Sequence, residues 1–370
     1  MYTQLYARPY SDGMSALPRP AARRSSLSPR HWVSEELFDF WAGRVHPLWT
    51  LRRARARLVS RTAASADAVT LVLRPNRHFR GVAPGQHVNL GVEVDGRRLS
   101  RSYSPTLLDD GCLAITVKAI TGGKVSQHLA QHAQAGEVFE LGQAFGGMTL
   151  PTTPVGRVLL LAAGSGITPM RALVRQMESA GMPVQVDLVY WAQQREAVCF
   201  ADELADIAAR HPGFRVHLAL TRDPAAPAAR VGDYDFSALG DVSSAQVMAC
   251  GPGGFVEAAN TRLQGQVATL QSEAFTPPVL PDAETGTVRV ELRRSGRTLE
   301  LPRGTSLLQA LEAEGLRPAS GCRMGICNTC VCGKASGVTR HTLTGEYAAE
   351  PATQVKLCVN SASTDLILEL

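Results

Sequence analysis

The side chains best suited to redox or metal chemistry are five cysteines within the last fifty residues. Four of them follow the pattern C-x4-C-x2-C with a late fourth member, namely Cys322, Cys327, Cys330 and Cys358. Four thiolates at this spacing are typical of a [2Fe–2S] cluster, although four cysteines also suit a closed zinc site. Zinc sites usually use two C-x2-C pairs, and only one is present here. The sequence therefore predicts the cluster, with Cys332 as a small buried residue beside the loop.

Two short motifs in the first half of the chain suit a flavin nucleotide. They are Arg101-Ser102-Tyr103-Ser104 and Gly123-Lys124-Val125-Ser126. Arg101 can neutralise a phosphate, Tyr103 offers a flat face to the isoalloxazine ring, and Ser104 offers a hydroxyl near its reactive N5. Gly123 lets the backbone approach a phosphate at a helix N-terminus, where Ser126 and free amides can bind it. Taken singly, each motif also fits a chance tetrapeptide or a plain turn.

A third group of residues suits a dinucleotide. Gly164 and Gly166 follow a buried strand pattern and precede a helix, which aims helix N-terminal amides at a pyrophosphate. A Cys-Gly-Pro motif follows a later strand, where Cys250 alone would also fit an inert strand-end thiol. The residues assigned to the cofactor from these two motifs are Gly164, Gly166, Thr168, Pro169, Cys250, Gly251 and Pro252.

Three kinds of scaffold are needed to position these residues. Short β-type runs between residues 52 and 150, separated by Gly, Pro and Asp, predict a small antiparallel barrel. Strand patterns that alternate with helix patterns from about 156 to 271 predict a doubly wound nucleotide-binding sheet. The predicted fold class is thus α+β and multidomain. The predicted boundaries are 1–50 for a basic leader and short helix, 51–152 for the barrel, 153–275 for the nucleotide-binding domain, 276–286 for a linker and 287–370 for the iron–sulfur domain.

The leader is the basic part of the chain. Residues 1–60 contain ten arginines and four acidic residues, so they carry +6, whereas the whole chain carries +5. Contact with an acidic partner or an anionic membrane surface is one interpretation, and a solvated tail is the other. A short helix follows, with Ser34 as its N-cap. Its apolar side chains are expected to pack on the body of the protein, namely Leu37, Phe38, Phe40 and Trp41.

Composition limits the function classes. A hydrophobic content of 45% with 19% charged residues is ordinary for a globular protein. No apolar run is long enough to span a bilayer, and the start lacks the apolar stretch of a secretory signal. Nucleic-acid binding is not predicted, because the basic stretch has few aromatics and no accompanying module. The expected location is cytoplasmic, with peripheral contact at the inner membrane face as an extension.

The order of these motifs resembles the ferredoxin–NADP reductase superfamily, and residues from about 286 onward resemble a plant-type ferredoxin. The resemblance rests on R-x-Y-S, G-x-x-S, Pro84-Gly85-Gln86-His87-Val88, G-x-G-x-x-P and C-G-P-x-x-F. It implies a C-terminal β-grasp domain and assigns the flavin to the two motifs above. It also implies that Cys250 lies by the nicotinamide ring and that Phe275 covers the flavin, although a core aromatic fits Phe275 as well.

The resemblance also bears on the choice of cofactors. The helix after Gly123 is similar to that of FAD-binding members, so FAD is predicted over FMN. Thr221 and Arg222 resemble the Ser-Arg pair that holds the 2′-phosphate of NADP, and Arg195 could assist. NADPH is therefore predicted over NADH.

The predicted function is an NAD(P)H-dependent flavin iron–sulfur reductase, with Ser104 and Cys250 at its catalytic centre. NAD(P)H would reduce the flavin, and electrons would pass singly through the cluster to a partner protein. A membrane di-iron fatty-acyl desaturase or hydroxylase is the predicted partner, because a basic leader ahead of the barrel resembles that group of reductases. The alternatives are the reductase of a Rieske-type aromatic-ring oxygenase and a non-catalytic iron–sulfur redox sensor.

Overall fold

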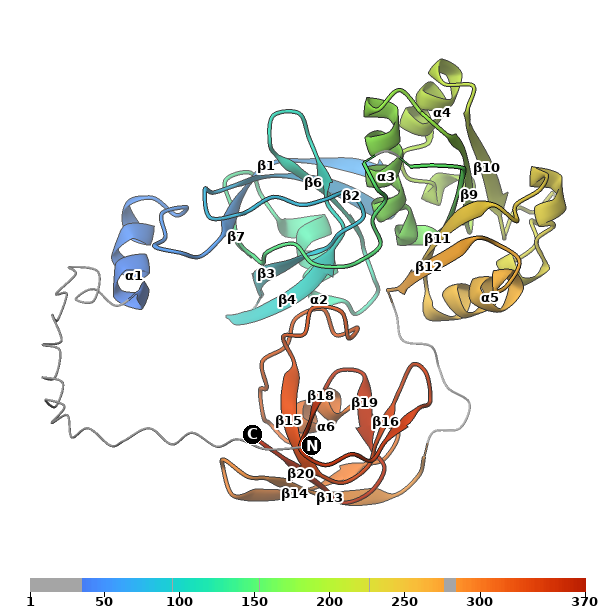
Figure 1. The fold of residues 1–370 in the computed structure, drawn as a ribbon. Helices are drawn as coiled ribbons and strands as arrows, with labels where there is room; N and C mark the ends of the chain where they lie inside the picture. Colours follow the sequence, from blue (N-terminus) through green and yellow to red (C-terminus); the bar gives the residue numbers. More distant parts are fainter. Residues whose placement is uncertain (1–34, 95, 153, 226, 276–283) are drawn as a thin grey trace, which may run out of the picture.

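Three sheet-based units follow one another along the chain in the computed structural model (Figure 1). It describes residues 35–370 except 95, 153, 226 and 276–283. The basic leader, the predicted Ser34 cap and most of the predicted linker lie outside the described residues. Helix α1 (Glu35–Val45) precedes the first unit.

The first unit is a curled antiparallel sheet. In the described residues its seven strands have the order β4-β3-β7-β1-β2-β6-β5. They are β1 (Arg55–Ser65), β2 (Ala68–Pro75), β3 (Val88–Val94), β4 (Arg97–Tyr103), β5 (Thr106–Leu107), β6 (Leu113–Lys118) and β7 (Val138–Leu141). The short helix α2 (Lys124–Gln127), continued by a π-helical turn over His128–His132, lies against β3 and β4. The predicted antiparallel barrel is confirmed.

The second unit is a parallel sheet whose described strands have the order β10-β9-β8-β11-β12. Its elements are β8 (Arg157–Ala163), α3 (Ile167–Ser179), β9 (Gln185–Ala192), α4 (Ala201–Arg210), β10 (Phe214–Leu220), β11 (Ala245–Gly251), α5 (Gly253–Leu263) and β12 (Thr269–Ala274). Four one-turn 3-10 segments join them, at Gly164–Gly166, Arg195–Ala197, Val231–Asp233 and Phe236–Leu239.

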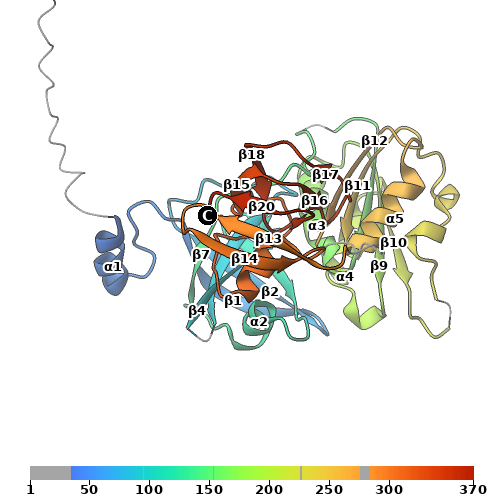
Figure 2. The ribbon, with the colours of Figure 1, turned by 90° about the horizontal axis from the view of Figure 1, so that it is seen from below.

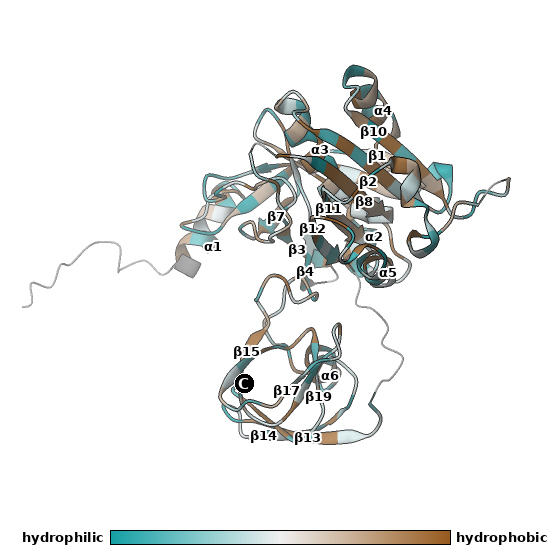
Figure 3. Ribbon diagram, turned by 45° about the vertical axis from the view of Figure 1, so that its right-hand side comes forward, coloured by the Kyte–Doolittle hydropathy of each residue, from teal (hydrophilic) through white to brown (hydrophobic). Residues whose placement is uncertain are grey.

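Strand β8 shows why this sheet is covered on both faces. Every residue of β8 is buried, and alternate side chains point to opposite faces of a strand. Val158 and Leu160 pack with α3 and α4, whereas Leu159 and Leu161 pack with α5. Figure 3 shows these hydrophobic strands between their helices. The predicted doubly wound sheet is confirmed.

The third unit contains the cysteine loop. Its main sheet has the described order β14-β13-β20-β15-β18, and a smaller sheet has the order β17-β16-β19. The elements are β13 (Thr287–Leu292), β14 (Arg297–Pro302), α6 (Leu307–Ala313), β15 (Val331–Ser336), β16 (Thr339–His341), β17 (Tyr347–Ala348), β18 (Thr353–Lys356), β19 (Asn360–Ala362) and β20 (Leu366–Leu368). Ser306 caps α6, because its hydroxyl accepts from the Gln309 amide.

The first unit contacts both of the others. The β1–β2 turn reaches the second unit, where the Ala66 amide donates to the Glu196 carbonyl at 2.9 Å. The third unit lies below β4 in Figure 1, and Figure 3 shows the same neighbourhood from another side. Strand β4, which carries most of the predicted flavin motif, therefore lies beside the unit that contains the cysteine loop.

Helix α1 differs from the prediction. Its apolar side chains do not pack on the body: Phe40 and Trp41 are 53% and 59% exposed. The buried member of the helix is instead the acidic Asp39, which accepts a hydrogen bond from the Leu51 amide at 2.7 Å. The usual rule that a surface helix turns its apolar stripe inward therefore fails here. None of the helices among the described residues is long and apolar enough to cross a membrane.

Candidate functional site

The cysteine loop brings its four predicted ligands together. Cys322, Cys330 and Cys358 are buried, Cys327 is partly exposed, and the Cys330 and Cys358 Sγ atoms lie 3.2 Å apart. Backbone amides point at these sulfurs: those of Met324, Ile326 and Cys327 donate to Cys322 Sγ at 3.3, 3.4 and 3.3 Å, and that of Gly325 donates to Cys358 Sγ at 3.2 Å.

Two features of the loop suit an iron–sulfur cluster. Thiols surrounded by amide donors form a donor set that stabilises thiolates and bridging sulfide. Gly325 has φ +77°, and a Cβ there would meet a Cγ of Val359 at 2.9 Å, so the loop is packed closely around its sulfurs. Cys332 differs from the set in its partner, because its thiol donates to the Gly333 carbonyl and the loop amides above donate to Cys322 and Cys358 instead.

Strand β4 and the residue after it present the first flavin motif. The Ser104 hydroxyl is buried and has no hydrogen-bond partner among the described residues, so a polar group of a ligand could satisfy it. Tyr103 is half-buried beside the barrel core. Ser102 donates to Asn89 Oδ1 on β3 at 2.6 Å. Burial and the nearby positive charge of Arg323 lower the pKa of Arg101, so an anion beside these two guanidinium groups would be favoured.

The second flavin motif forms the turn at the start of α2. Gly123 caps α2, and a Cβ there would meet Ser126 Oγ at 2.5 Å. The Ser126 hydroxyl already donates to the Gly123 carbonyl and accepts from the Ile120 amide. This hydroxyl therefore closes the turn, which leaves the backbone amides to approach a phosphate. Val125 lies in the barrel core and Lys124 is exposed.

The two dinucleotide motifs meet through backbone contact. Gly164 has φ +56°, a conformation that favours glycine, where β8 turns into α3. Gly166 passes so close to β11 that a Cβ there would overlap the Cys250 carbonyl. Thr168 and Pro169 are buried in the first turn of α3, where the Thr168 hydroxyl donates to the Ser165 carbonyl.

A cavity of about 770 Å³ opens beside this junction. Its lining includes Gly164, Pro252, Thr221 and Arg222, and its floor includes Trp191 and Phe255, whose ring centroids are 5.2 Å apart. Two further cations, Lys118 and Arg230, line it and were missed at the sequence level. Arg195 is not among the lining residues. The size and chemistry of the cavity suit a dinucleotide.

His87 connects this junction to the flavin strand. The residue is fully buried just before β3, with its ring stacked on Phe145 and edge-on to Phe275. Its Nε2 lies 3.0 Å from Glu273 Oε2, although the two atoms are not aligned as a hydrogen bond. Glu273 in turn faces Cys250 across the β11–β12 pair. The sequence motif placed His87 only in a barrel strand, so its role at the junction was missed.

Burial favours the neutral forms of these groups. It raises the pKa of Glu273 to about 7 and lowers the pKa of His87 to about 4, against a smaller opposite effect of the Cys322 charge. Burial, followed by the Glu273 charge, raises the pKa of the Cys250 thiol well above its ordinary value. At neutral pH the junction therefore contains a neutral imidazole, a thiol and a carboxyl group near its titration midpoint.

A pH experiment tests this assignment. A raised carboxyl pKa means that the folded chain binds one more proton than the unfolded chain between about pH 4.5 and 7, so its contribution to stability falls as pH rises. His87 has the opposite slope between about pH 4 and 6.5. The test compares wild type with Glu273→Gln in urea unfolding from pH 5 to 8. Between pH 5 and pH 8, the unfolding free energy of wild type should fall by up to about 3 kcal/mol relative to that of Glu273→Gln.

The matched control is Glu93→Gln, which changes an exposed glutamate on β3 and should reproduce the wild-type pH dependence. If the unfolding free energy of Glu273→Gln depends on pH in the same way as that of wild type, Glu273 is ionised throughout this pH range.

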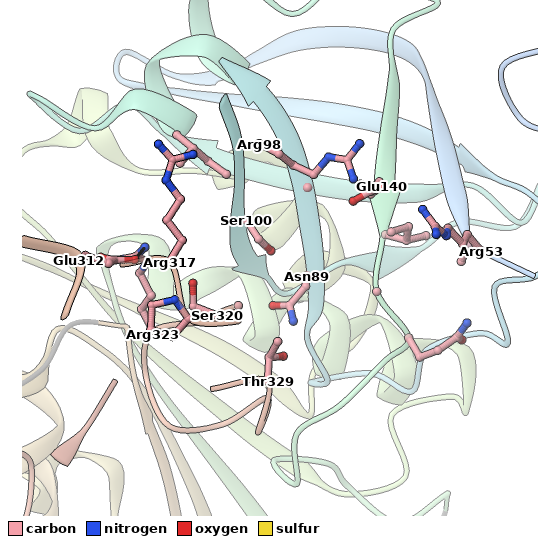
Figure 4. A pocket seen from close by; sticks show the side chains of 18 of the residues that line it. Arg53, Asn89, Arg98, Ser100, Glu140, Glu312, Arg317, Ser320, Arg323 and Thr329 are labelled. Atoms are coloured by element: carbon pink, nitrogen blue, oxygen red, sulfur yellow. Dashed lines mark hydrogen bonds and ion pairs between the residues drawn. The ribbon is translucent and has the colours of Figure 1, made fainter. Parts of the chain in front are cut away.

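The cysteine loop docks directly on the flavin-binding unit. A Cβ at Gly321 would lie 2.8 Å from Asn89 Nδ2, 2.8 Å from Cys327 Sγ and 3.0 Å from Thr329 Oγ1. Beside this contact lies a pocket of about 1020 Å³ with walls from both units (Figure 4). Arg323 lines it and forms a two-pronged ion pair with Glu312. Because this pocket is built by two units, neither motif alone indicated it.

Comparison with known families agrees with the three units. Residues 55–148 match the Oxidoreductase FAD-binding domain, residues 160–261 the Oxidoreductase NAD-binding domain, and residues 290–359 the 2Fe-2S iron-sulfur cluster binding domain. The predictions of an oxidoreductase with FAD, NAD(P)H and a [2Fe–2S] cluster are confirmed. The last match favours the cluster over the zinc alternative, and the alternative of a non-catalytic sensor is not supported.

Individual relatives match most of the chain. An NADPH oxidoreductase of Mycobacterium tuberculosis is 33% identical over 338 residues, which cover 88% of this chain and 87% of that protein. The ferredoxin reductase component of a 3-ketosteroid-9-alpha-monooxygenase from the same species is 33% identical and covers 71% of this chain and 77% of its own. The solved structure of a phthalate dioxygenase reductase is 25% identical, has a TM-score of 0.60, and covers 85% of this chain and 97% of its own. The chain belongs to the ferredoxin reductase superfamily of FAD- and NAD(P)-binding oxidoreductases that carry a C-terminal [2Fe–2S] domain.

Proposed function

We propose that the chain is the electron-transfer reductase of an oxygenase system. The observation that supports this best is the contact of Gly321 with Asn89, because it places the cysteine loop against the strand pair that bears the flavin motif. The order of sites in space is then the dinucleotide cavity, the His87 junction, the flavin strand and the cysteine loop. This order suits electron transfer from NAD(P)H to a protein acceptor.

The residues of the chain have separable roles in this proposal. Arg101 and the Gly123 turn hold the flavin phosphates, Tyr103 packs on the ring, and the unpaired Ser104 hydroxyl donates to it. The Gly164–Gly166 turn holds the pyrophosphate. Cys250 and Phe275 position the nicotinamide, and Arg222 with Thr221 holds the 2′-phosphate of NADPH.

The bound groups supply the redox chemistry: hydride transfer from NADPH to flavin, and one-electron transfer through the cluster. The chain contributes orientation and exclusion of water. His87, Phe145 and Phe275 pack together where the first and second units meet, and Glu273, whose pKa is raised to about 7, can take up or release a proton there at neutral pH. The four cysteines would hold the cluster beside β4, and backbone amides fix the sulfurs of two of them, Cys322 and Cys358.

Two acceptor classes are distinguished by different observations. The relatives named above that donate to oxygenases favour an oxygenase component of the Rieske type. The membrane di-iron desaturase predicted from the leader receives no support from them. It is favoured only by the basic sequence ahead of the barrel, whose five arginines in residues 1–34 would suit an anionic membrane.

A reconstitution experiment tests the proposal. The purified protein is supplied with NADPH and with either a Rieske-type oxygenase component and its substrate or a di-iron desaturase in liposomes. We expect product formation with the oxygenase, together with NADPH-dependent reduction of cytochrome c. Product only with the desaturase would favour the second acceptor. Cytochrome c reduction without product from either would contradict both acceptor assignments and leave the reductase activity standing.

A further inference from the structure

Helix α1 and the segment after it expose an apolar surface, which we call the α1 face. It consists of Phe40, Trp41, Val45 and Trp49, which are 53%, 59%, 73% and 56% exposed. Phe40 and Trp41 contact each other edge to face at 5.4 Å between ring centroids. A group of exposed large apolar side chains within one short segment often marks a binding surface.

Polar contacts, rather than apolar packing, fix the orientation of α1. Asp39 is the buried residue of the helix, and it accepts from the Leu51 amide at 2.7 Å and pairs with Arg53 at 3.5 Å. The segment after α1 is fastened to the barrel by Asn76, whose amide donates to the Leu48 and Arg53 carbonyls and to the Thr50 hydroxyl. Rotation of α1 to bury its aromatic side chains would break these bonds. The exposed face is therefore built into the fold.

The positive charge of the N-terminal region comes from the sequence ahead of α1, because residues 35–53 balance Glu35, Glu36 and Asp39 against Arg44, Arg52 and Arg53. The Arg44 guanidinium lies over the Phe40 ring at 4.4 Å and near the Trp41 ring at 5.6 Å, so a cation stands among the aromatic side chains. Arg52 is exposed just beyond it. The 34 residues that precede α1 add five arginines and one acidic residue. An exposed aromatic pair with an arginine beside it, preceded by a basic sequence, suits contact with the interface of an anionic bilayer.

The position of α1 leaves the catalytic region accessible. Figures 1 and 2 show α1 at the end of the barrel that is remote from the parallel sheet and its dinucleotide cavity. Contact of a flat surface with the α1 face would therefore leave this cavity open to water.

We propose that the α1 face binds the surface of an anionic lipid bilayer, with Phe40 and Trp41 inserted among the lipids and Arg44 at the headgroups. This contact is a property of the reductase itself, whichever acceptor it serves. A second copy of the chain or a protein partner on this face would be a different result of the test.

The test uses the full-length holoenzyme in flotation with vesicles of phosphatidylcholine alone or mixed with phosphatidylglycerol. We expect binding to the mixed vesicles, with a blue shift of tryptophan fluorescence. The double variant Phe40→Ser/Trp41→Ser should bind at least about tenfold more weakly, because two inserted aromatic side chains are lost. The matched control is Val155→Ser/Leu218→Ser, which removes two exposed apolar side chains from the second unit and should bind like wild type.

Two further measurements separate binding through the α1 face from binding through other parts of the chain. Ferricyanide reduction by NADPH should be equal in all variants, which confirms that each is folded. Deletion of residues 1–30 should weaken binding mainly at low salt, because screening removes the long-range attraction of arginines first. The proposal is overturned if wild type does not bind mixed vesicles, if Phe40→Ser/Trp41→Ser binds equally well, or if this variant instead abolishes self-association in sedimentation.

Discussion

Serine in place of any one of Cys322, Cys327, Cys330 and Cys358 is expected to lower NADPH-dependent cytochrome c reduction by more than about 100-fold, since loss of an outer-sphere partner alone costs about 10- to 100-fold in many metal sites. Ferricyanide reduction should be nearly unchanged, because the flavin reduces this small acceptor directly. The physical reason is that a serine hydroxyl remains protonated at neutral pH and cannot replace a thiolate ligand.

The cluster variants should differ from a nearby control. Cys332→Ser changes a cysteine on β15 whose side chain lies in the core and bonds to the Gly333 carbonyl. It should retain the visible spectrum and iron content of wild type. Equal loss of iron in Cys332→Ser would mean that the set of ligands has been assigned incorrectly.

Arg222→Ala should raise the KM for NADPH about 10- to 150-fold and leave the KM for NADH almost unchanged. A hydrogen bond to a charged group is worth about 1.5–3 kcal/mol, and each 1.4 kcal/mol corresponds to about tenfold. Arg222 lines the dinucleotide cavity, where its backbone amide is fixed by the Gln193 carbonyl at 2.8 Å. Initial rates of ferricyanide reduction with each nucleotide measure the effect.

The control for this prediction is an arginine in the loop after β9, the strand next to the one that Arg222 follows. Arg195→Ala removes an exposed arginine that does not line the cavity, so both KM values should stay near those of wild type. Arg230→Ala should raise the KM for NADPH less than Arg222→Ala does. Arg230 lines the cavity but does not belong to the Thr221-Arg222 pair that resembles a 2′-phosphate-binding motif. Parallel increases in both KM values for Arg222→Ala would remove the 2′-phosphate role.

The sequence allowed much of this architecture to be predicted because its strongest signals are local. The cysteine spacing lies mostly within a nine-residue loop, and the parallel strands are continuous apolar runs such as the fully buried β8. Both patterns depend on neighbours in the chain, so tertiary packing did not alter them. The same holds for Gly164 and Gly166, whose positions after a strand already indicated a turn for phosphate.

The features that were missed or predicted wrongly depend on contacts between distant segments. His87 and Glu273 meet only because a barrel strand and the last parallel strand converge, and no spacing rule indicates this pair. The orientation of α1 was predicted wrongly because one buried carboxylate, Asp39, fixes the helix more strongly than its apolar pattern does. The Ser126 hydroxyl closes its own turn, a role that the motif alone does not distinguish from phosphate binding.

The close approach of Gly166 to Cys250 has a consequence for engineering. The turn at Gly164–Gly166, for which we propose pyrophosphate binding, and the strand end that bears the Cys250 thiol are in backbone contact, with no room for a side chain between them. Main-chain atoms thus set the distance between the turn and the thiol, whereas Arg222 lines the cavity and takes no part in this contact. We therefore expect that side-chain replacement at Arg222 can change nucleotide preference while the spacing between turn and thiol stays the same.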